Sequence, residues 1–413
     1  MAESLTALLE KLGKHPLPAI DLSLARMEKL LEALGNPQRQ LPPTIHVAGT
    51  NGKGSTIAFL RAIYEAAGYR VHVYSSPHLV RFNERIVLAG EEASDEVLSA
   101  AIARVLAHTA NNPVTFFEST TAAAFLCFAE YPADILLLEV GMGGRLDATN
   151  VITKPIASVI TPIGMDHAEF LGNTLEKIAA EKAGIMKPGC LCMTAPQIPS
   201  VERVFSEMAK NTGAQHIHAA LWQKQSIPPA SVALQGAHQL QNAALACAVV
   251  RALRPYFNVV DATITTGLMQ AKWPARLQKL RKGMLVECWG ARGDITLDGG
   301  HNGHAASRMA EWLASQPTPR LMIMGMLNSK DPKAFFAPFV GVADAVYCIP
   351  IPHTPECHAP ERMAEIGRDL GIEAIFPATD ALAALRQAKV YHNGTVLIAG
   401  SLYLAGEILK NHG

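Results

Sequence analysis

The chain has 413 residues, 49% of them hydrophobic and 17% charged, and its 36 basic side chains balance its 36 acidic ones. This length and composition exclude a disordered chain and predict a globular protein with more than one domain. With no net charge and no basic run interleaved with aromatic residues, a nucleic acid is not expected as a partner.

Signals for secretion or membrane insertion are not evident in the sequence. Residues 1–11 are amphipathic and include acidic side chains, unlike a signal peptide. The longest apolar run, residues 122–129, is far too short to cross a bilayer. The seven cysteines show no disulfide framework. We therefore expect a cytoplasmic protein that does not bind a membrane.

The most informative segment is residues 44–56, an apolar strand that runs into a glycine-rich turn. Gly49, Gly52 and Gly54 allow the backbone to curl until several N–H groups point at one place. A helix is expected to begin at about Ser55, so that its positive end faces the same point, and Lys53 adds a mobile cation. The segment predicts a cradle for a triphosphate. Its glycine between lysine and serine departs from the commonest P-loop pattern.

The first part of the chain alternates strand-like and helix-like segments. Short apolar runs that suit buried parallel strands occupy residues 45–48, 71–74, 135–140 and 156–161. Helical patterns occupy residues 55–67, 94–108 and 120–129. This alternation predicts a P-loop α/β domain with a doubly wound, mostly parallel sheet that binds ligands at the carboxyl ends of its strands.

Residues 187–235 are polar, rich in proline and glutamine, and expected to be less regular. Helical patterns return at 238–253 and 261–272, and Trp-Pro-Ala-Arg at 273–276 then interrupts them. We place a domain boundary there, with an N-terminal domain of residues 1–273 and a C-terminal domain of residues 274–413.

The second domain again alternates the two kinds of segment, which predicts a smaller, Rossmann-like α/β domain. Its expected strands occupy residues 295–297, 320–324, 345–349 and 395–399. Its expected helices occupy residues 304–315, 360–370 and 378–388.

A triphosphate requires a magnesium ion with hard oxygen ligands. Glu139 ends an apolar strand and precedes a glycine-rich loop, so it is either a ligand of this ion or an ordinary strand-end glutamate. His167 and Ser76 each follow another strand. His167 is a metal ligand or is bonded to a loop carbonyl, and Ser76 is a metal ligand or the cap of a turn.

Three further polar residues are candidates for the reaction. Lys182, in Glu-Lys-Ala-Gly, is either a solvated helix lysine or an amine whose carbamylation makes it a carboxylate-like metal ligand. Asp298 follows a strand, where an acid can accept ribose hydroxyls, and His301 can meet a substrate carboxylate. Both also suit a simple turn.

Together these segments identify the chain as similar to the folylpolyglutamate synthase/dihydrofolate synthase family of the Mur ligase superfamily. The resemblance covers nearly the whole chain. The motifs that carry it are Asp21-Leu-Ser-Leu24, His46-Val-Ala-Gly-Thr-Asn-Gly-Lys-Gly-Ser55, Tyr74-Ser-Ser-Pro-His-Leu79, Thr115-Phe-Phe-Glu118, Leu138-Glu-Val-Gly-Met-Gly-Gly-Arg-Leu-Asp-Ala-Thr-Asn150, Asp166-His167, Glu181-Lys-Ala-Gly184, Asp298-Gly-Gly-His-Asn302 and Gly400-Ser-Leu-Tyr403.

The resemblance implies an ATP-dependent ligase that activates a carboxylate as an acyl phosphate and joins it to the amine of L-glutamate. The acceptors it implies are dihydropteroate and the glutamyl tail of reduced folates. It also implies ATP and Mg²⁺, with a second metal site and carbamylation of Lys182 left open. Relatives of this kind are commonly monomers.

Carried over residue by residue, the resemblance implies four groups of site residues. The nucleotide group is Gly49, Asn51, Gly52, Lys53, Gly54, Ser55, Asn242, Arg276 and Asp298. The magnesium ligands are Ser76, Glu139 and His167. The pterin pocket is Asp21, Leu22, Ser23, Leu24, Thr115, Phe116, Phe117, Glu118, Leu146, Asp147 and Ala148, and His301 and Ser401 lie near the glutamate. Lys53, Lys182, Asp298 and His301 are the expected catalytic residues.

Other functions remain open at this point. A P-loop kinase or NTPase would share the cradle, and a non-catalytic nucleotide-binding module would share it without forming an amide. Another Mur-type ligase or a monofunctional folylpolyglutamate synthase would share most of the motifs. The segments 21–24 and 115–118 favour the pterin-binding family over a ligase for a cell-wall nucleotide.

Overall fold

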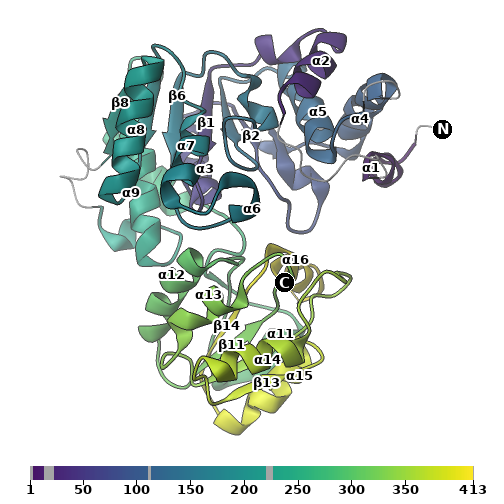
Figure 1. Ribbon diagram of the computed structural model, residues 1–413, viewed down its shortest axis with the longest axis vertical. Helices are drawn as coiled ribbons and strands as arrows, with labels where there is room; N and C mark the ends of the chain where they lie inside the picture. Colours follow the sequence, from purple (N-terminus) through teal and green to yellow (C-terminus); the bar gives the residue numbers. More distant parts are fainter. Residues whose placement is uncertain (1–2, 14–22, 110–112, 220–226, 413) are drawn as a thin grey trace. The chain divides into compact units, whose positions relative to one another are not determined.

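The computed structural model describes residues 3–13, 23–109, 113–219 and 227–412, which form two compact units (Figure 1). Unit 1 comprises Met1–Ala233 and Gln241–Lys272, and unit 2 comprises Leu234–Leu240 and Trp273–Gly413. Each unit contains one sheet with its own helices. The two-domain α/β architecture predicted from the sequence is confirmed.

The sheet of unit 1 has the strand order β4-β3-β2-β5-β1-β6-β7-β8. From β2 to β8 neighbouring strands are parallel, whereas β3 and β4 add an antiparallel edge. The strands are β1 Thr44–Ala48, β2 Val71–Tyr74, β3 Ile86–Leu88, β4 Glu91–Glu92, β5 Ile135–Glu139, β6 Ala157–Ile160, β7 Leu191–Thr194 and β8 Gln215–His218.

The described part of this unit has ten α-helices, one of which, α9, begins in residues that are grouped with unit 2. They are α1 Leu5–Gly13, α2 Ala25–Ala33, α3 Lys53–Ala66, α4 Asp95–Thr109, α5 Phe116–Glu130, α6 Ala168–Leu171, α7 Leu175–Ala183, α8 Pro199–Thr212, α9 Ala237–Ala252 and α10 Asp261–Gln270. The first residues of α9, as far as Leu240, are grouped with unit 2.

Helices cover the sheet of unit 1 on both faces. On one face, α1, α2, α4 and α5 pack on Leu136 and Leu138, and α7 and α8 pack on Ala48 and Ile160. The connection from β1 to β2 runs across the sheet in the opposite direction from that of β6 to β7. Because such crossovers are right-handed, α3 lies on the other face, where it packs against α10.

Strand β1 lies between β5 and β6. From β1 the chain crosses toward β2 on one side of the sheet, whereas the connections from β6 to β7 and from β7 to β8 run toward the other side. This is the topological switch point of a doubly wound sheet, where loops at the carboxyl ends of strands diverge and leave room for a ligand. The glycine-rich turn follows β1 at this position. The prediction of a doubly wound sheet is therefore confirmed, and the position of the ligand site at this edge stays a prediction.

Two expectations about secondary structure are wrong. The segment expected to be less regular contains β7, α8 and β8 over its residues 191–218. The polar residues of α8 lie outward while Val201 and Phe205 are buried, and β8 is a polar edge strand. The helix after the glycine turn begins at Lys53 and not at Ser55.

Unit 2 has a six-stranded sheet of order β13-β12-β11-β14-β10-β9, parallel except for β9. Its strands are β9 Gln278–Lys279, β10 Ile295–Leu297, β11 Arg320–Met324, β12 Ala345–Cys348, β13 Ile375–Pro377 and β14 Thr395–Ala399. Its helices are α11 Met284–Trp289, α12 Gly303–Ala314, α13 Pro332–Phe336, α14 Pro360–Asp369, α15 Ala381–Ala388 and α16 Leu402–His412.

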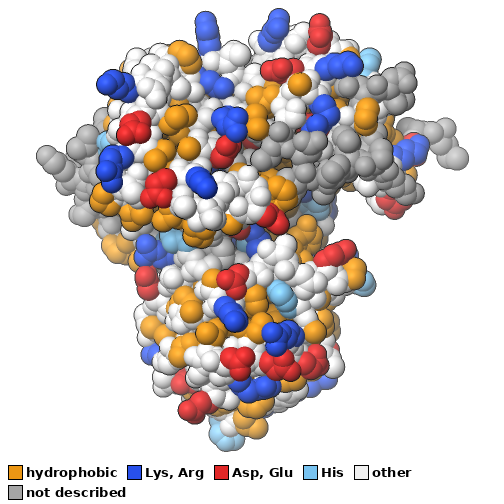
Figure 2. Space-filling view, viewed as in Figure 1, with side chains coloured by type: hydrophobic (Ala, Val, Ile, Leu, Met, Phe, Trp, Pro, Cys, Tyr) orange, Lys and Arg blue, Asp and Glu red, His pale blue; other side chains and the backbone are white. Residues whose placement is uncertain are grey.

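The surface and the helix lengths bear on possible partners. On the face shown in Figure 2, basic and acidic side chains are interspersed, not gathered by sign. Within the described ranges, none of the helices combines the length and the apolar character that crossing a membrane requires.

The contact between α10 and α3 depends on a glycine. A Cβ at Gly267 would lie 2.5 Å from the Cα of Ile63, so the two helices would have to separate. We expect Gly267→Ala to lower the free energy of unfolding by about 1–3 kcal/mol, the usual cost of overpacking. Gly13→Ala is the control, because a Cβ there meets nothing within 4 Å. Urea titrations followed by circular dichroism would test this, and equal midpoints for both variants would contradict it.

Candidate active site

The turn after β1 is packed too closely for side chains at two positions. Gly49 has φ 146° and Gly52 has φ 90°, both in the region that favours glycine. A Cβ at Gly49 would lie 1.8 Å from Thr161 Oγ1, and a Cβ at Gly52 would lie 2.5 Å from Asn242 Oδ1. The turn is therefore held between the loop after β6 and helix α9.

Hydrogen bonds fix the same turn from the side of β6. The N–H groups of Thr50 and Asn51 donate to the carbonyl of Pro162, at 3.1 and 3.4 Å. The hydroxyl of Thr161 donates to the carbonyl of Asn51 at 2.8 Å. These hydrogen bonds order the turn without using the first N–H groups of α3.

The first intrahelical hydrogen bond of α3 runs from the N–H of Thr56 to the carbonyl of Gly52, at 2.9 Å. Helix geometry then leaves the N–H groups of Lys53, Gly54 and Ser55 without an intrahelical acceptor. These groups and the positive end of the helix form an anion site of the kind that binds phosphates. The residues present therefore fit a nucleoside triphosphate.

A cation and a carboxylate meet beside this anion site. Lys53 Nζ lies 3.3 Å from the carbonyl of Gly49 and 3.9 Å from Glu139 Oε1. Glu139, at the end of β5, is only 5% exposed. The N–H of Ser76, which follows β2, donates to Glu139 Oε2 at 3.4 Å. A buried carboxylate next to a phosphate site supplies the hard oxygen that Mg²⁺ requires.

His167 lies at the carboxyl end of the neighbouring strand, β6. Its backbone is left-handed, with φ 50°, and it precedes helix α6. Its Nε2 lies 3.9 Å from Asp166 Oδ1. The structure thus brings Ser76 and Glu139 into contact and puts His167 at the same edge of the sheet. Metal binding by these three residues remains a prediction.

Lys182 on α7 is not a solvated helix lysine, because only 5% of it is exposed. Burial, reinforced by the positive charge of Lys53, lowers the pKa of Lys182 to about 7. The carboxylates of Asp166 and Asp147 act in the opposite direction. A substantial fraction of this amine is therefore neutral, and nucleophilic, near neutral pH.

Two of the predicted pterin-pocket residues cap helix α5. The N–H of Thr115 donates to Glu118 Oε2 at 2.6 Å, and the N–H of Glu118 donates to Thr115 Oγ1 at 3.1 Å. Arg26 of α2 pairs with Glu118 at 3.1 Å. Glu118 thus joins α2 to α5 through this cap. Arg26 is not among the residues predicted from the sequence, since no local pattern links residues 92 positions apart.

The first turn of α5 presents aromatic rings. Phe116 and Phe117 are half-buried, and the ring of Phe117 packs so closely on Gly141 that a Cβ there would lie 2.4 Å from it. This contact places an aromatic surface beside the loop that follows Glu139. The remaining pocket candidates lie on two segments, with Asp147 and Ala148 buried and Ser23, Leu24 and Leu146 half-buried. Asp21 and Leu22 lie outside the described residues.

In unit 2, Asp298 organises the turn that carries Arg276. Asp298 Oδ2 accepts the N–H of Leu277 at 2.9 Å, and Oδ1 accepts the N–H of Gly300 at 2.7 Å. Leu277 and Ala275 are both left-handed, with φ 45° and 54°. Non-glycine residues hold such conformations only where surrounding bonds determine them. A nucleotide contact by Arg276 and Asp298 remains a prediction.

The other two candidates of unit 2 lie at neighbouring strand ends. His301 follows β10, and its Nδ1 lies 3.1 Å from the carbonyl of Gly299. Ser401 follows β14, where its hydroxyl accepts the N–H of Tyr403 at 3.1 Å and caps α16. Strands β10 and β14 are adjacent and parallel, so both residues lie at one edge of this sheet.

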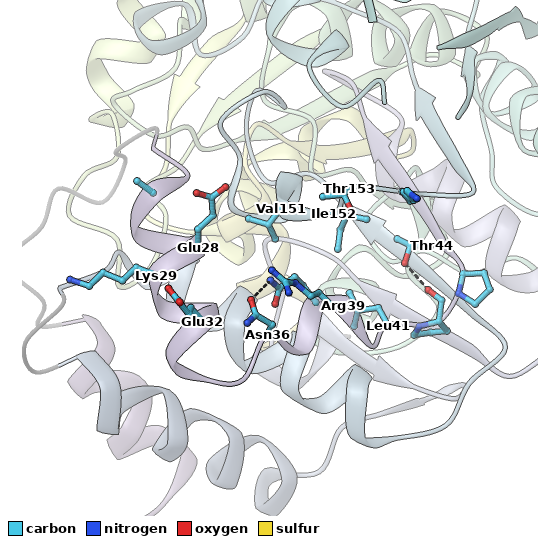
Figure 3. Close-up of a pocket in the computed structure, with 15 residues that line it drawn as sticks. Glu28, Lys29, Glu32, Asn36, Arg39, Leu41, Thr44, Val151, Ile152 and Thr153 are labelled. Atoms are coloured by element: carbon cyan, nitrogen blue, oxygen red, sulfur yellow. Dashed lines mark hydrogen bonds between the residues drawn. The ribbon is translucent and has the colours of Figure 1, made fainter. Parts of the chain in front are cut away.

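A cavity of about 840 Å³ lies elsewhere in unit 1 (Figure 3). It is lined by one side of α2, residues 36–44 and residues 151–154, and its charged lining residues include Glu28, Glu32, Lys29 and Arg39. Thr44, which lines it, begins β1, whereas the phosphate turn follows the end of β1. This cavity is therefore distinct from the phosphate site.

Comparisons with known proteins agree with this geometry. A model of the Mur ligase middle domain matches residues 47–189, and a model of the dihydrofolate synthetase C-terminal domain matches residues 285–411. The dihydrofolate synthase/folylpolyglutamate synthase of Bacillus subtilis is 33% identical over 423 residues, covering 94% of each chain.

Two solved structures resemble the chain over nearly its whole length. E. coli FolC in complex with DHPP and ADP has a TM-score of 0.86 and 29% identity, covering 99% of this chain and 97% of that one. The bifunctional folylpolyglutamate synthase/dihydrofolate synthase of Yersinia pestis, complexed with AMPPNP and Mn ion, has a TM-score of 0.85 and 31% identity. It covers 99% of this chain and 98% of that one.

The phosphate turn, the doubly wound sheet and these matches define an ATP-dependent ligase of the Mur ligase type. Within this class, the chain belongs to the dihydrofolate synthase/folylpolyglutamate synthase family. A P-loop kinase and a simple nucleotide-binding module are thereby excluded.

The packing of the phosphate turn gives a test with a matched control. We expect Gly52→Ala to weaken ATP binding at least about 10-fold, because the new methyl group displaces Asn242 or the turn itself. Gly35→Ala is the control: its φ of 84° is nearly that of Gly52, but a Cβ there meets nothing within 4 Å. Isothermal titration calorimetry would measure both, and normal affinity in Gly52→Ala would contradict the packing argument.

Proposed function

We propose that this protein joins L-glutamate to dihydropteroate and to the glutamyl tail of reduced folates, with ATP activating the acceptor carboxylate as an acyl phosphate. The observation that carries the proposal is the contact of Lys53 with buried Glu139 at the start of α3. It supplies a phosphate site, a cation and a metal-binding oxygen in one place. Membership of the family supplies the substrate class.

The residues of unit 1 divide the work of binding ATP. The N–H groups at residues 53–55 and the ammonium of Lys53 bind the phosphates, and Asn242 supports the turn from α9. Glu139, Ser76 and His167 would hold the magnesium ion. When bound, this ion neutralises charge on the phosphates during transfer. Lys53 adds to that effect from the protein.

The acceptor is proposed to bind beside the loop that follows Glu139. Phe117 offers a flat aromatic surface for a pterin ring, next to backbone made accessible by Gly141. DHPP in the E. coli relative supports a ligand of this class. Roles of Arg276, Asp298, His301 and Ser401 toward nucleotide and glutamate are proposed from the family motifs alone.

We propose further that residues 1–273 act as the ATPase domain with the folate pocket and residues 274–413 as the glutamate ligase domain. A cytoplasmic monomer with only small-molecule partners fits the balanced charge and the interspersed surface of Figure 2. The alternative is a monofunctional folylpolyglutamate synthase. The two differ in whether dihydropteroate is accepted.

The acceptor range is tested directly by product analysis. With ATP, Mg²⁺ and L-glutamate, we expect mass spectrometry to show one added glutamate on dihydropteroate and on a reduced monoglutamyl folate. Product from the folate alone would establish the monofunctional alternative. Product from neither would overturn the proposed function.

The role of Lys53 is tested by its removal. We expect Lys53→Ala to lower turnover by at least about 10³-fold, because a charge that stabilises phosphoryl transfer is lost. The circular dichroism spectrum should be unchanged, since the hydrogen bonds from Thr50, Asn51 and Thr161 fix the turn without the ammonium. Lys210→Ala, on the exposed face of α8, serves as the control and should retain full activity. Near-normal turnover in Lys53→Ala would refute the assignment.

Carbamylation of Lys182 requires the neutral amine to attack carbon dioxide. With a pKa lowered to about 7, Lys182 is mostly protonated below this pH and mostly neutral above it. In ¹³C-labelled bicarbonate, we therefore expect a carbamate NMR signal that grows as the pH rises from 6 to 8. Lys182→Met should lack it. A signal that is absent at pH 8, or unaffected by the substitution, would contradict the prediction.

A further inference from the structure

His46 is a buried polar residue in the middle of β1, between Ile45 and Val47. It lies in β1, three residues before Gly49, and has no exposed surface. Its ring points to the face of the sheet crossed by the connection from β5 to β6, where Nε2 lies 2.9 Å from Thr149 Oγ1. This contact joins the strand that carries the phosphate turn to a segment 103 residues away.

The direction of the hydrogen bonds follows from the donors available. The Thr149 hydroxyl donates its single proton to Asp147 Oδ1. Its oxygen can then only accept from His46, so the proton of the imidazole is on Nε2. Burial, with a smaller effect of Lys187, lowers the pKa of His46 to about 3, so that the ring is neutral.

This arrangement leaves the other ring nitrogen unsatisfied. Nδ1 of His46 is buried and has no hydrogen-bond partner among the described residues. A buried acceptor without a partner typically costs about 1–3 kcal/mol, which an aliphatic residue in β1 would avoid. The unsatisfied Nδ1 makes a histidine at this position costly for stability. We therefore look for its role in the hydrogen bond that Nε2 makes.

Asp147, at the end of this chain of hydrogen bonds, closes the loop after β5. Besides the Thr149 hydroxyl, it accepts the N–H of Met142 at 2.9 Å and the N–H of Thr149 at 3.0 Å. The loop that it closes carries Gly141, against which Phe117 packs, and Gly144. A Cβ at Gly144 would lie 2.9 Å from the Cα of Lys182. The loop thus lies between the proposed acceptor surface and the buried lysine.

We propose that His46 is a positioning residue for the glutamylation reaction: by donating from Nε2 to Thr149, it directs the threonine hydroxyl to Asp147 and fixes the loop 141–149 between Phe117 and Lys182. It does not touch substrate in this role. The inference rests on the proposed function for its activity readout, and it adds a residue of the phosphate-binding strand to those that shape the acceptor pocket.

Two amide substitutions separate this role from packing. The amide of glutamine in His46→Gln reaches the position of Nε2 and still donates to Thr149, whereas that of asparagine in His46→Asn stops near Nδ1. We expect His46→Gln to retain kcat/KM for the folate acceptor within about threefold, and His46→Asn to lose about 10–100-fold. This range corresponds to one buried hydrogen bond in a charged network. The KM for ATP should stay within about twofold in both, because the bonds of the phosphate turn do not involve His46.

A double-mutant cycle tests whether His46 acts through Thr149. We expect Thr149→Val to lower kcat/KM for the folate acceptor about as much as His46→Asn does. In the double variant, kcat/KM should fall no more than about twofold below that of the poorer single variant, since both substitutions remove the same chain of hydrogen bonds. Losses that multiply would overturn the proposal. So would equal activity of the Gln and Asn variants, or a loss confined to the KM for ATP.

Failure of this inference is distinguishable from failure of the proposed function. The wild-type protein must first yield glutamylated product, and absence of product there concerns the function and not His46. Thermal unfolding of each variant is followed in parallel. If Thr149→Val does not fold, the comparison of His46→Gln with His46→Asn alone decides the proposal.

Discussion

The close approach of the phosphate turn to its neighbours is the constraint on which the rest of unit 1 depends. At Gly49 and Gly52 the backbone lies where a Cβ would collide with Thr161 and Asn242. Because proteins pack to nearly crystalline density, such contacts fix the turn to within a few tenths of an ångström. The loop after β6 and helix α9 must therefore take up matched positions before the N–H groups of α3 can converge on a phosphate.

Charge near this turn adds a second constraint. Lys53 lies 3.9 Å from Glu139 and also lowers the pKa of Lys182, so a single ammonium influences both a predicted metal ligand and a predicted modified lysine. In a partly buried site, such interactions are stronger than in water and less screened by salt. We therefore expect an anion that binds beside Lys53 to raise the pKa of Lys182, and nucleotide binding to influence the protonation of this lysine.

Local patterns were sufficient for part of the fold. The turn after β1 and the helix α3 could be predicted because the residues that form them are consecutive and glycine is required there. Strand β8 could not be predicted, since its polar residues Gln215, His216 and His218 form a strand only by pairing with β7. The left-handed conformations of Ala275 and Leu277 could not be predicted either. Their conformation depends on the side chains of Gln278 and Asp298, which accept their N–H groups.

The candidate site shows the same division. Sequence motifs found Lys53, Glu139 and Lys182, whose positions follow from strand ends and helix starts. They did not separate acids that meet a ligand from acids that hold a loop. Asp147 and Asp298 each accept at least two backbone N–H groups, and Glu118 completes a helix cap and an ion pair.

These three acids are also predicted site residues, so we expect their structural bonds to serve the function as well. A carboxylate that accepts backbone N–H groups fixes the turn on which a contacting residue stands, as Asp298 does for the turn of Arg276. Removing it would impair activity without any direct contact being lost. The amide isostere distinguishes the two roles, since asparagine can replace only one of the two acceptor oxygens of Asp147 or Asp298. Replacing an acid that organises a loop by its amide should therefore lower both the activity and the local stability. Replacing an acid that only binds a ligand should lower the activity alone.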